Sequence, residues 1–594
     1  MELDCDLECA PRSYLFDFSL GEDRRSTDLN WNDGQNGEYL EEIAYTVDGQ
    51  VRGTIRPGTY DVYVSRGLEY DLSITKGVVV AGGKRASLSV VLNRSVNTAD
   101  YIGADLHLHS SGSLDSSMSS ENRVLSSAAE GLEYAVSTDH NFITDYEPAI
   151  VSLGLEDWIK SMVGVEVSTL EMGHFNAFPL RYDVGAASHF PFVEFCYEPR
   201  SDKSNETAFD WVECKPDQIF DHVRQLGRYH YDSTIVQANH PRDSVLGYFS
   251  QYYMNPYTGV PEENPSDDNY SLSSLIYPQN SITGQFKREN FSYEFDAIEV
   301  FNGKRFDQLH GWRLPTGLDE SFYASKQAYE CDGDSGHPLN GPGMPLLQHG
   351  GHIAYPGAVD DWMNLLNRGI KVTATGNSDS HSGHEEVGFP RNYIYITPDA
   401  DTGTPRDEPP TKVHDLDIVD GLKEHQAIAT NGPFVKLSVV SRNDAGEVTY
   451  AYRVGQTVNY TASNAGRNVE IQIEVNSADW IDVDRLVLWA NGEIIETIEI
   501  ADEVGASGRA TDDKMLVTRV KQFDVDTWIA LEAYGSNNLF PVVVPKEDPP
   551  SNISDALEGL VGGLGLDPSA FGGGDGLSGP NPLQRAIPYA LTNP

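Results

Sequence analysis

Cysteine is scarce: five residues are spread over a chain of 594, and no two of them form a Cys-x-x-Cys pair. A metal site built from thiolates is therefore not expected. Cys196 and Cys214 could form a disulfide if the protein is exported, and buried free thiols are the alternative. No apolar run reaches the ~18 residues that a membrane-spanning helix needs, so no membrane span is expected.

Basic residues are also few. The chain has 42 Lys and Arg residues against 90 Asp and Glu residues, which gives a formal net charge of -48. So acidic a surface repels nucleic acid and anionic membranes, and neither is expected as a partner. The start of the chain lacks a basic region followed by an apolar one, so no signal peptide is visible, and the chain is either cytosolic or a trimmed mature form.

The first part of the chain alternates polar and apolar residues with the period of two that is typical of β-strands. Residues 1–98 predict a small β module, with a turn and strand over 53–64 and a second strand over 86–92. The module contains no histidine, and we interpret it as a scaffold or binding accessory.

The same alternation returns near the other end. Residues 431–545 predict a β-sandwich, because 469–475 alternates cleanly and 485–490 runs into an Asn-Gly turn. Residues 546–594 are a Gly- and Pro-rich loop or tail, with a candidate edge strand at 588–591.

Between residues 99 and 430, strand-like and helix-like segments alternate, and polar residues follow each strand. Helices are predicted from Ser119 to a stop at Gly131, and over 147–160, 217–229 and 359–368. This alternation predicts an α/β fold with a parallel barrel, whose polar residues gather at one end of the strands.

The strand Ala104–His109 is the centre of the functional prediction. Asp105, His107 and His109 share one face of an extended strand, because side chains alternate between faces. The two imidazoles then lie about 7 Å apart along a strand that rises ~3.3 Å per residue, and they can bind one metal ion.

Further imidazoles and carboxylates follow or end the later strands. These additional candidate ligands are Asp115, His140, Glu166, His174, His240, Asp379 and His381. Imidazoles together with carboxylates suit Zn²⁺, Mn²⁺ or Fe²⁺. Metals ~3.5–4 Å apart can activate a hydroxide between them, so we expect hydrolysis at phosphorus or at a carbonyl carbon. We also expect Asp105 and Asp139 to hold neighbouring histidine rings.

Nearby positive charge would separate a phosphate substrate from a carbonyl substrate. The candidates, which follow short segments of the barrel region, are Arg242 after 240–241, Lys304 and Arg305 after 301–303, and Arg391 after 388–390. Arg242 is the first choice for a catalytic contact, because it follows His240 and Pro241 directly. The alternative for each is an ion pair with one of the many acids. Glu299 ends another strand and is a candidate metal ligand or base.

These motifs, in this order and spacing, resemble the PHP (polymerase and histidinol phosphatase) superfamily, and their phrasing is similar to its CehA/McbA branch. The resemblance covers roughly residues 100–430 and implies a distorted (β/α)7 barrel with two or three divalent metals. It implies that His107, His109 and Asp379 bind the first metal, and that Glu166 bridges to a second metal held by His174 and His240. The third would be held by Asp115, His140 and His381.

Two features qualify what the resemblance implies. Many PHP members carry the acid sooner after His-x-His, in a Ser-Asp-Gly phrase, whereas here it is Asp115, so a binuclear site is the alternative. The Pro-Gly-x-Tyr-x-Val phrase at 57–62 resembles carboxypeptidase-regulatory-like β modules, which are common on exported proteins. This favours a periplasmic or extracellular mature protein, with a cytoplasmic location left open.

The sequence therefore predicts a metal-dependent hydrolase acting on a small molecule, with a phosphate ester as the first substrate class. An aryl ester or carbamate is the second. A surface binding protein with an inactive barrel is the alternative from another functional class. The metal, the natural substrate and the oligomeric state are left open.

Overall fold

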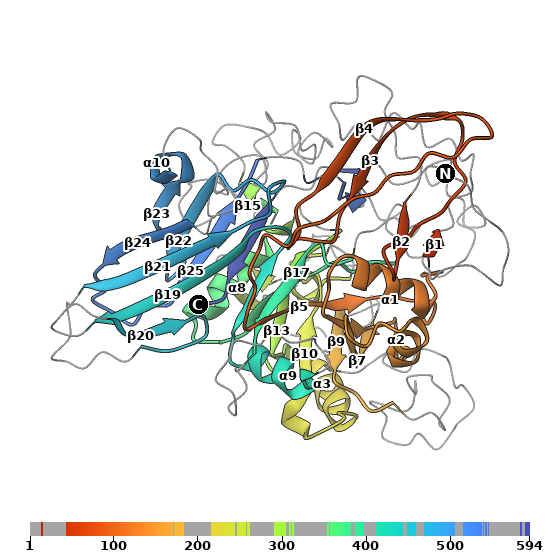
Figure 1. Cartoon of the computed structure of the whole chain (residues 1–594). Coiled ribbons are helices and arrows are strands. Elements are labelled where there is room, and N and C mark those ends of the chain that lie inside the picture. The colour runs from red at the N-terminus through yellow and green to blue at the C-terminus, as the bar shows by residue number, and fades with distance from the viewer. Residues whose placement is uncertain are drawn as a thin grey trace, which may run out of the picture.

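The structure is a computed structural model of the chain (Figure 1). Residues are described with their side chains over the following ranges: 43–113, 115–169, 172–182, 215–243, 246–252, 254–256, 258–261, 290–304, 308–310, 357–381, 387–396, 412–440, 448–458, 468–503, 515–536, 539, 541–542 and 588–594. The backbone alone is described at 13–15, 312–313, 353–355, 441–442, 504, 544–545 and 583–584. Cys196, Cys214 and most of the predicted tail lie outside these residues.

Sheets dominate this mixed α/β fold. The largest sheet has nine strands in the order β23 (Glu493–Glu499), β22 (Arg485–Ala490), β25 (Ile529–Tyr534), β28 (Tyr589–Thr592), β18 (Ala427–Thr430), β17 (Arg391–Tyr395), β5 (Tyr101–Leu108), β6 (Tyr134–Ser137) and β7 (Lys160–Val163). It therefore joins the predicted barrel region to the predicted C-terminal module across residue 430.

A second, five-stranded sheet completes the central region. Its order is β16 (Thr373–Asn377), β13 (Ala297–Asn302), β10 (Ile235–Ala238), β9 (His174–Phe178) and β8 (Val165–Ser168). Isolated parallel bridges connect it to the larger sheet, between Leu108 and Ser380 and between His140 and Glu166. Gly164 alone separates β7 from β8.

A closed (β/α)7 barrel of parallel strands is not confirmed. The strands are divided between two sheets, and β9 runs antiparallel to both β8 and β10. Between β8 and β9 the chain is too short for a crossover helix, so these two strands pair as neighbours in opposite directions.

Helices are few among the described residues. They are α1 (Ser120–Ala129), α2 (Glu147–Leu153), α3 (Pro216–Gln225), α4 (Tyr248–Gln251), α8 (Ala358–Asn367), α9 (Asp415–Lys423), α10 (Ile500–Val504) and the 3-10 turn η2 (Tyr231–Ser233). Helices form in the four predicted segments, and Ser119 caps α1 by accepting a hydrogen bond from Asn122 N. None of the described helices combines the length and apolar character that crossing a membrane requires.

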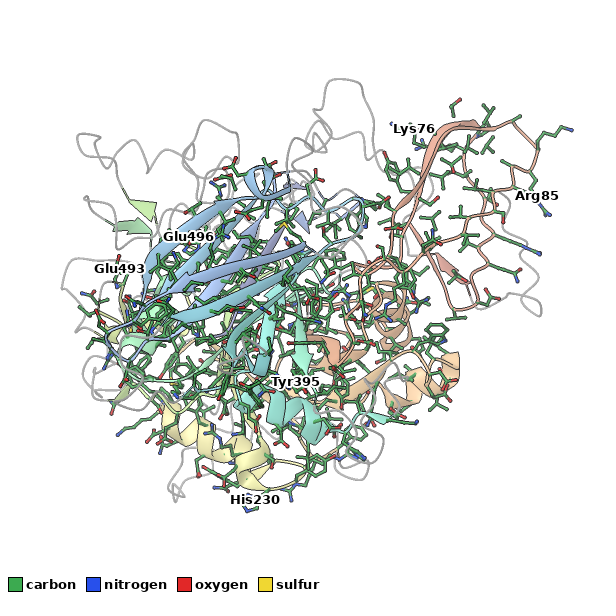
Figure 2. The ribbon with its side chains drawn as sticks, turned by 60° about the vertical axis from the view of Figure 1, so that its left-hand side comes forward. Lys76, Arg85, His230, Tyr395, Glu493 and Glu496 are labelled. Atoms are coloured by element: carbon green, nitrogen blue, oxygen red, sulfur yellow. The ribbon has the colours of Figure 1, made fainter. Side chains whose placement is uncertain are left out.

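The predicted N-terminal module stays a prediction, and the structure describes one strand pair in it. β3 (Gly58–Val64) pairs antiparallel with β4 (Ser73–Val80), and Figure 2 shows Lys76 and Arg85 on this module at the edge of the molecule. The predicted strand over 86–92 is wrong: these residues form no strand, and Val91 is 82% exposed. Among the described residues the sheet of this module contains β3 and β4 alone, so the alternating segment has no neighbouring strand.

Four other sheets among the described residues are short two-stranded pairs. They are β1 (Ser13–Leu15) with β2 (Ala44–Thr46), β11 (Met254–Asn255) with β12 (Val260–Pro261), β14 (Trp312–Arg313) with β15 (Ile353–Tyr355), and β26 (Val544–Pro545) with β27 (Leu583–Gln584).

In the C-terminal part, a four-stranded sheet accompanies the end of the nine-stranded one. Its order is β20 (Val448–Arg453), β19 (Phe434–Arg442), β21 (Val469–Asn476) and β24 (Met515–Lys521). Along β21, buried apolar residues alternate with half-buried polar residues. The apolar residues belong to one hydrophobic core together with residues of β22 and β25. The predicted final strand forms as β28, but it lies inside the sheet, between β18 and β25, and not at an edge.

A buried polar cluster fastens the central region to this C-terminal part. Glu532 on β25 accepts hydrogen bonds from Tyr589 Oη at 2.6 Å and Trp489 Nε1 at 2.8 Å, and it lies 2.7 Å from His310 Nε2. Burial lowers the pKa of His310, but the carboxylates of Glu532 and Asp360 outweigh it and raise that pKa to about 10. His310 is therefore a buried cation at neutral pH.

This cluster predicts a pH-dependent stability. The folded-state pKa of His310 lies above the ordinary value of about 6.5, so its contribution is complete below that pH and is lost as the pH rises towards 10. We expect His310→Gln to cost about 3–5 kcal/mol near neutral pH, because it leaves Glu532 buried without its cation, and to cost less at high pH. Chemical denaturation at pH values between about 6.5 and 10 measures the free energy of unfolding and its dependence on pH. Exposed His230 (Figure 2) provides the control, His230→Gln, and an equal slope for wild type and His310→Gln would contradict the prediction.

Candidate metal centre

The candidate centre forms where strands of the two central sheets end together. β5 carries His107 and is followed directly by His109, and β8 carries Glu166. The other members begin or follow strands: His140 after β6, His174 at the start of β9, His240 after β10, and Asp379 and His381 after β16. On the same strand as the two histidines, Leu106 and Leu108 pack into hydrophobic clusters, as the alternation along β5 predicts.

Three overlapping groups of side chains could hold metal ions. In each group the ligand atoms lie within 4.8 Å of one another. The groups are His107, His109 and Asp379; His140, Glu166 and His174; and His109, His140 and His381. His109 and His140 each belong to two groups, so the three candidate positions are adjacent.

Glu166 lies between five imidazoles, of which His109 Nε2 is 3.6 Å from Oε2. Its Oε1 is 3.2 Å from His107 Nε2, 3.1 Å from His174 Nδ1 and 3.6 Å from His240 Nε2. Its Oε2 is 2.5 Å from His140 Nδ1. Burial raises the pKa of this carboxyl, but the surrounding imidazoles hold it well below its usual range. An ionised carboxylate with both oxygens facing different imidazoles has the arrangement needed to bridge two cations.

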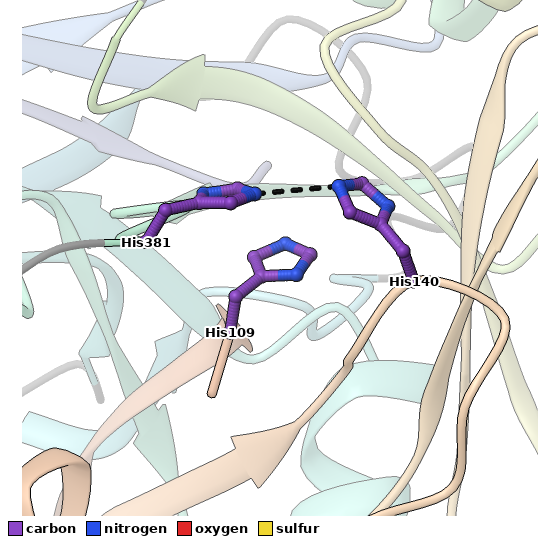
Figure 3. A group of neighbouring side chains, drawn as sticks. All are labelled: His109, His140 and His381. Carbon is purple, nitrogen blue, oxygen red and sulfur yellow. Dashed lines mark hydrogen bonds between the residues drawn. The ribbon is translucent and has the colours of Figure 1, made fainter. Parts of the chain in front are cut away.

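Asp115 joins the group that contains His140 and His381. Its Oδ2 is 3.2 Å from His140 Nε2 and 3.3 Å from His381 Nε2. Figure 3 shows the rings of His109, His140 and His381 turned towards one another, with His381 Nε2 and His140 Nε2 3.3 Å apart. The structure therefore brings Asp115 to the centre despite its later position after the His-x-His pair.

Glu299 contacts two of the candidate metal ligands, His107 and His240. It is buried, and its Oε1 lies 2.9 Å from His107 Nδ1 while its Oε2 accepts the backbone N–H of His240 at 2.9 Å. A carboxylate at Nδ1 orients an imidazole so that Nε2 faces the metal position. Glu299 thus contacts the side of the His107 ring that faces away from Glu166 and Asp379, and it lies outside the three groups.

The expectation that Asp105 and Asp139 hold histidine rings is wrong. Asp105 accepts hydrogen bonds from the backbone N–H groups of His107, Ser378 and Gly388. Asp139 accepts from Ser113 Oγ at 2.9 Å, and Ser113 Oγ lies 2.8 Å from His109 Nδ1. The ring of His109 is therefore held through a serine hydroxyl, for which the sequence gives no signal.

A buried arginine on α1 joins two loops of the centre. Arg123 Nε donates to the carbonyl of His109 at 2.8 Å, and its Nη1 and Nη2 donate to Ser380 Oγ and the Ser380 carbonyl at 2.7 and 2.9 Å. Ser380 lies between Asp379 and His381. Arg123 is a supporting residue that sequence reasoning missed, because nothing in a helical pattern marks an arginine as buried.

The backbone is strained at the same place. His240 and Asp379 have φ angles of 25° and 53°, and Asn141, beside His140, has 51°. Residues other than glycine rarely adopt such angles, and they concentrate at functional sites where the surroundings hold them.

The ring nitrogens of the candidate ligands have the surroundings that a bound cation requires. Nε2 of His107 and Nε2 of His109 are buried and make no hydrogen bond, although carboxylate oxygens of Asp379 lie 3.3 and 3.2 Å away. His240 Nδ1 is also buried without one. Burial, together with positive charge from His381 and His140, keeps the pKa of His109 well below its usual value, so this ring stays neutral. A neutral imidazole nitrogen that faces a carboxylate, as His109 Nε2 does, is a metal donor.

The predicted cations lie in different places. Arg242 pairs with Asp361 through Nε and Nη2, at 2.5 and 2.6 Å, and Nη2 also donates to the carbonyl of Met254. Its predicted contact with substrate stays a prediction. Arg391 is buried and donates to the carbonyls of Gly388 and Glu130.

Lys304, in contrast, lies against the centre. Its Nζ is 2.7 Å from His381 Nδ1 and 3.7 Å from Asp379 Oδ1. Arg305 lies outside the described residues.

Comparisons with known proteins add little. No protein-family model matches the chain, and no curated protein matches it. Among solved structures, the chain is similar to a two-domain protein from Bacteroides vulgatus containing a predicted PHP-like metal-dependent phosphoesterase. That match has 12% identity and a TM-score of 0.28, and it covers 85% of this chain and all of the other. This TM-score is too low to show a shared fold.

Removing the charge of the central carboxylate tests the centre itself. We expect Glu166→Gln to lose at least one equivalent of bound metal per chain, because the amide replaces the anion that faces five imidazoles. Metal analysis of dialysed protein measures the loss. The matched control is Glu130→Gln, which changes a buried glutamate outside the cluster. Equal metal content in wild type and Glu166→Gln would contradict the assignment.

Glu299 provides a second test. Glu299→Gln keeps the side-chain volume but weakens the acceptor for His107 Nδ1, so we expect metal affinity to fall about 10- to 100-fold with the fold retained. Competition with a chromophoric chelator measures the affinity, and circular dichroism checks the fold. If the affinity is unchanged, Glu299 does not orient His107.

Proposed function

We propose that this protein is a metal-dependent hydrolase that acts on a small phosphate ester at a centre of two or three divalent metal ions. The proposal rests above all on the buried, unbonded ring nitrogens of His107 and His109 facing the carboxylates of Glu166 and Asp379. Burying so many ionisable groups without a compensating cation is costly.

The residues fit the following division. His107, His109 and Asp379 would hold one ion, and Glu166 would bridge to a second ion with His174 and His240. Asp115, His140 and His381 would hold a third. The distances within this set support either two or three ions, and the donor types suit Zn²⁺, Mn²⁺ or Fe²⁺.

A pair of such ions supplies a nucleophile at neutral pH and stabilises charge on the reacting oxygens. The protein's own residues position that chemistry. Glu299 orients His107, Ser113 positions His109 between Asp139 and the centre, and Arg123 ties the loop of His109 to Ser380. Each of these contacts is buried, so the donors are held in place before substrate arrives.

We further propose that the central region belongs with the PHP superfamily, in its CehA/McbA branch, and that its strands form a distorted barrel. The bridges Leu108–Ser380 and His140–Glu166, which connect the ends of the two central sheets, support this reading. We place the mature protein in the periplasm or outside the cell, an inference that depends on the resemblance of the N-terminal module alone.

The decisive experiment compares two substrate classes on the same protein. We expect p-nitrophenyl phosphate to be hydrolysed after loading with Zn²⁺, Mn²⁺ or Fe²⁺, and the activity to disappear with chelator and return with metal. Naphthyl esters test the carbonyl alternative under the same conditions. Activity that resists chelation, or no activity with any of these metals, would count against a hydrolase and favour a binding protein.

A further inference from the structure

Three of the four candidate cations, Arg242, Lys304 and Arg391, lie among the described residues, and their surroundings differ. Asp361 and the carbonyl of Met254 engage Arg242, and two carbonyls engage Arg391. Lys304 differs, because its ammonium lies beside two candidate metal ligands, at 2.7 Å from His381 Nδ1 and 3.7 Å from Asp379 Oδ1.

The turn that carries Lys304 is built into the centre. Asn302 accepts the backbone N–H of Lys304 at 2.9 Å, and its amide nitrogen donates to Glu299 Oε2 at 3.0 Å and to Asp379 Oδ2 at 3.2 Å. One side chain therefore ties the backbone of Lys304 to two carboxylates of the centre.

Close packing fixes the same turn from the other side. Gly303 donates its N–H to the carbonyl of Asn377 at 2.9 Å. A Cβ at Gly303 would lie 2.6 Å from the carbonyl oxygen of Ser378, so a larger residue would push the turn away. The lysine is thus held next to the loop of Asp379 and His381 by backbone contacts as well as by its own charge.

The side chain is shielded but not sealed. Lys304 is 13% exposed, whereas the side chains of His107, His109 and Glu166 are 0% exposed. Lys304 therefore keeps some contact with solvent, as do the side chains of His140 at 18% and Asp115 at 29% exposed, so a molecule entering from solvent can reach this part of the cluster.

The charge of the whole chain makes this placement significant. With a formal net charge of -48, the protein repels an anion at long range, although salt screens this beyond about 8 Å. An anionic substrate therefore depends on positive charge within a few ångströms of the centre. A lysine ammonium is a compact donor that suits phosphate oxygens, whereas a neutral ester offers no anionic oxygen to it.

We propose that Lys304 binds a non-bridging oxygen of the phosphate group and makes this centre favour phosphate esters over carboxylic esters. This inference rests on the proposed function, which it deepens by naming the residue that selects the substrate class.

The test uses Lys304→Met, which keeps the length of the side chain without the charge, and Lys304→Arg, which restores the charge. Binding of inorganic phosphate to metal-loaded protein is measured by calorimetry. We expect Lys304→Met to weaken phosphate binding about tenfold or more, the loss expected for one charge-assisted hydrogen bond, and Lys304→Arg to recover most of it. Metal content should be unchanged in both.

The control is Lys423→Met, which removes another partly buried lysine, at the end of α9, that pairs with Asp296. It should bind phosphate as wild type does. Turnover gives a second readout: kcat/KM should fall about tenfold or more for p-nitrophenyl phosphate in Lys304→Met, and less than about threefold for p-nitrophenyl acetate. If Lys304→Met does not fold, Lys304→Gln replaces it.

Two results would overturn the proposal. Unchanged phosphate affinity in metal-loaded Lys304→Met would show that the ammonium does not touch the anion. Loss of metal from Lys304→Met would show that the lysine organises Asp379 and His381 and does not select substrate. Failure of the proposed function is distinct, because then wild-type protein itself would hold no metal and hydrolyse neither substrate.

Discussion

The buried carboxylate of Glu166 is the interaction on which the centre depends. Five imidazoles from four different segments face its two oxygens, and their positive potential keeps it ionised despite full burial. A charge in such a place is tolerated only where opposite charge or a metal compensates it. The strand ends must therefore meet accurately, and much of the surrounding structure serves this requirement.

Polar groups behind the ligands provide that accuracy. Asp105 fixes backbone N–H groups near His107, Ser378 and Gly388, while Arg123 joins the carbonyl of His109 to Ser380. These contacts act on the main chain and leave the ring nitrogens to face one another. The positive φ angles of His240 and Asp379 indicate that the loops are held in conformations they would not adopt alone.

The sequence predicted the members of the centre better than the scaffold around them. Alternation along β5 and the placement of His140, His240 and Asp379 after strands were visible as patterns of period two followed by polar residues. The antiparallel course of β9 and the interior position of β28 were not, because strand direction and neighbours depend on long-range pairing. The ring-holding roles of Glu299 and Ser113 were equally hidden, since they depend on which side chains meet in space.

Residues 86–92 show the opposite error, a predicted strand that does not form. Polar and apolar residues alternate over the first part of this segment, yet it forms no strand, whereas β21 lies between β19 and β24. A sequence pattern of period two indicates a segment that can form a strand. It does not show whether a neighbouring strand is available to pair with it.

The interior place of β28 bears on how the chain is assembled during synthesis. Thr430 Oγ1 of β18 donates to the carbonyl of Tyr589, a residue 159 positions later, and β25 reaches β18 through β28 alone in the order of the sheet. The two halves of the large sheet can therefore be joined only after residues 589–592 have left the ribosome. Until then β18 and β25 each present an open edge, the kind of surface to which a chaperone or a second nascent chain binds.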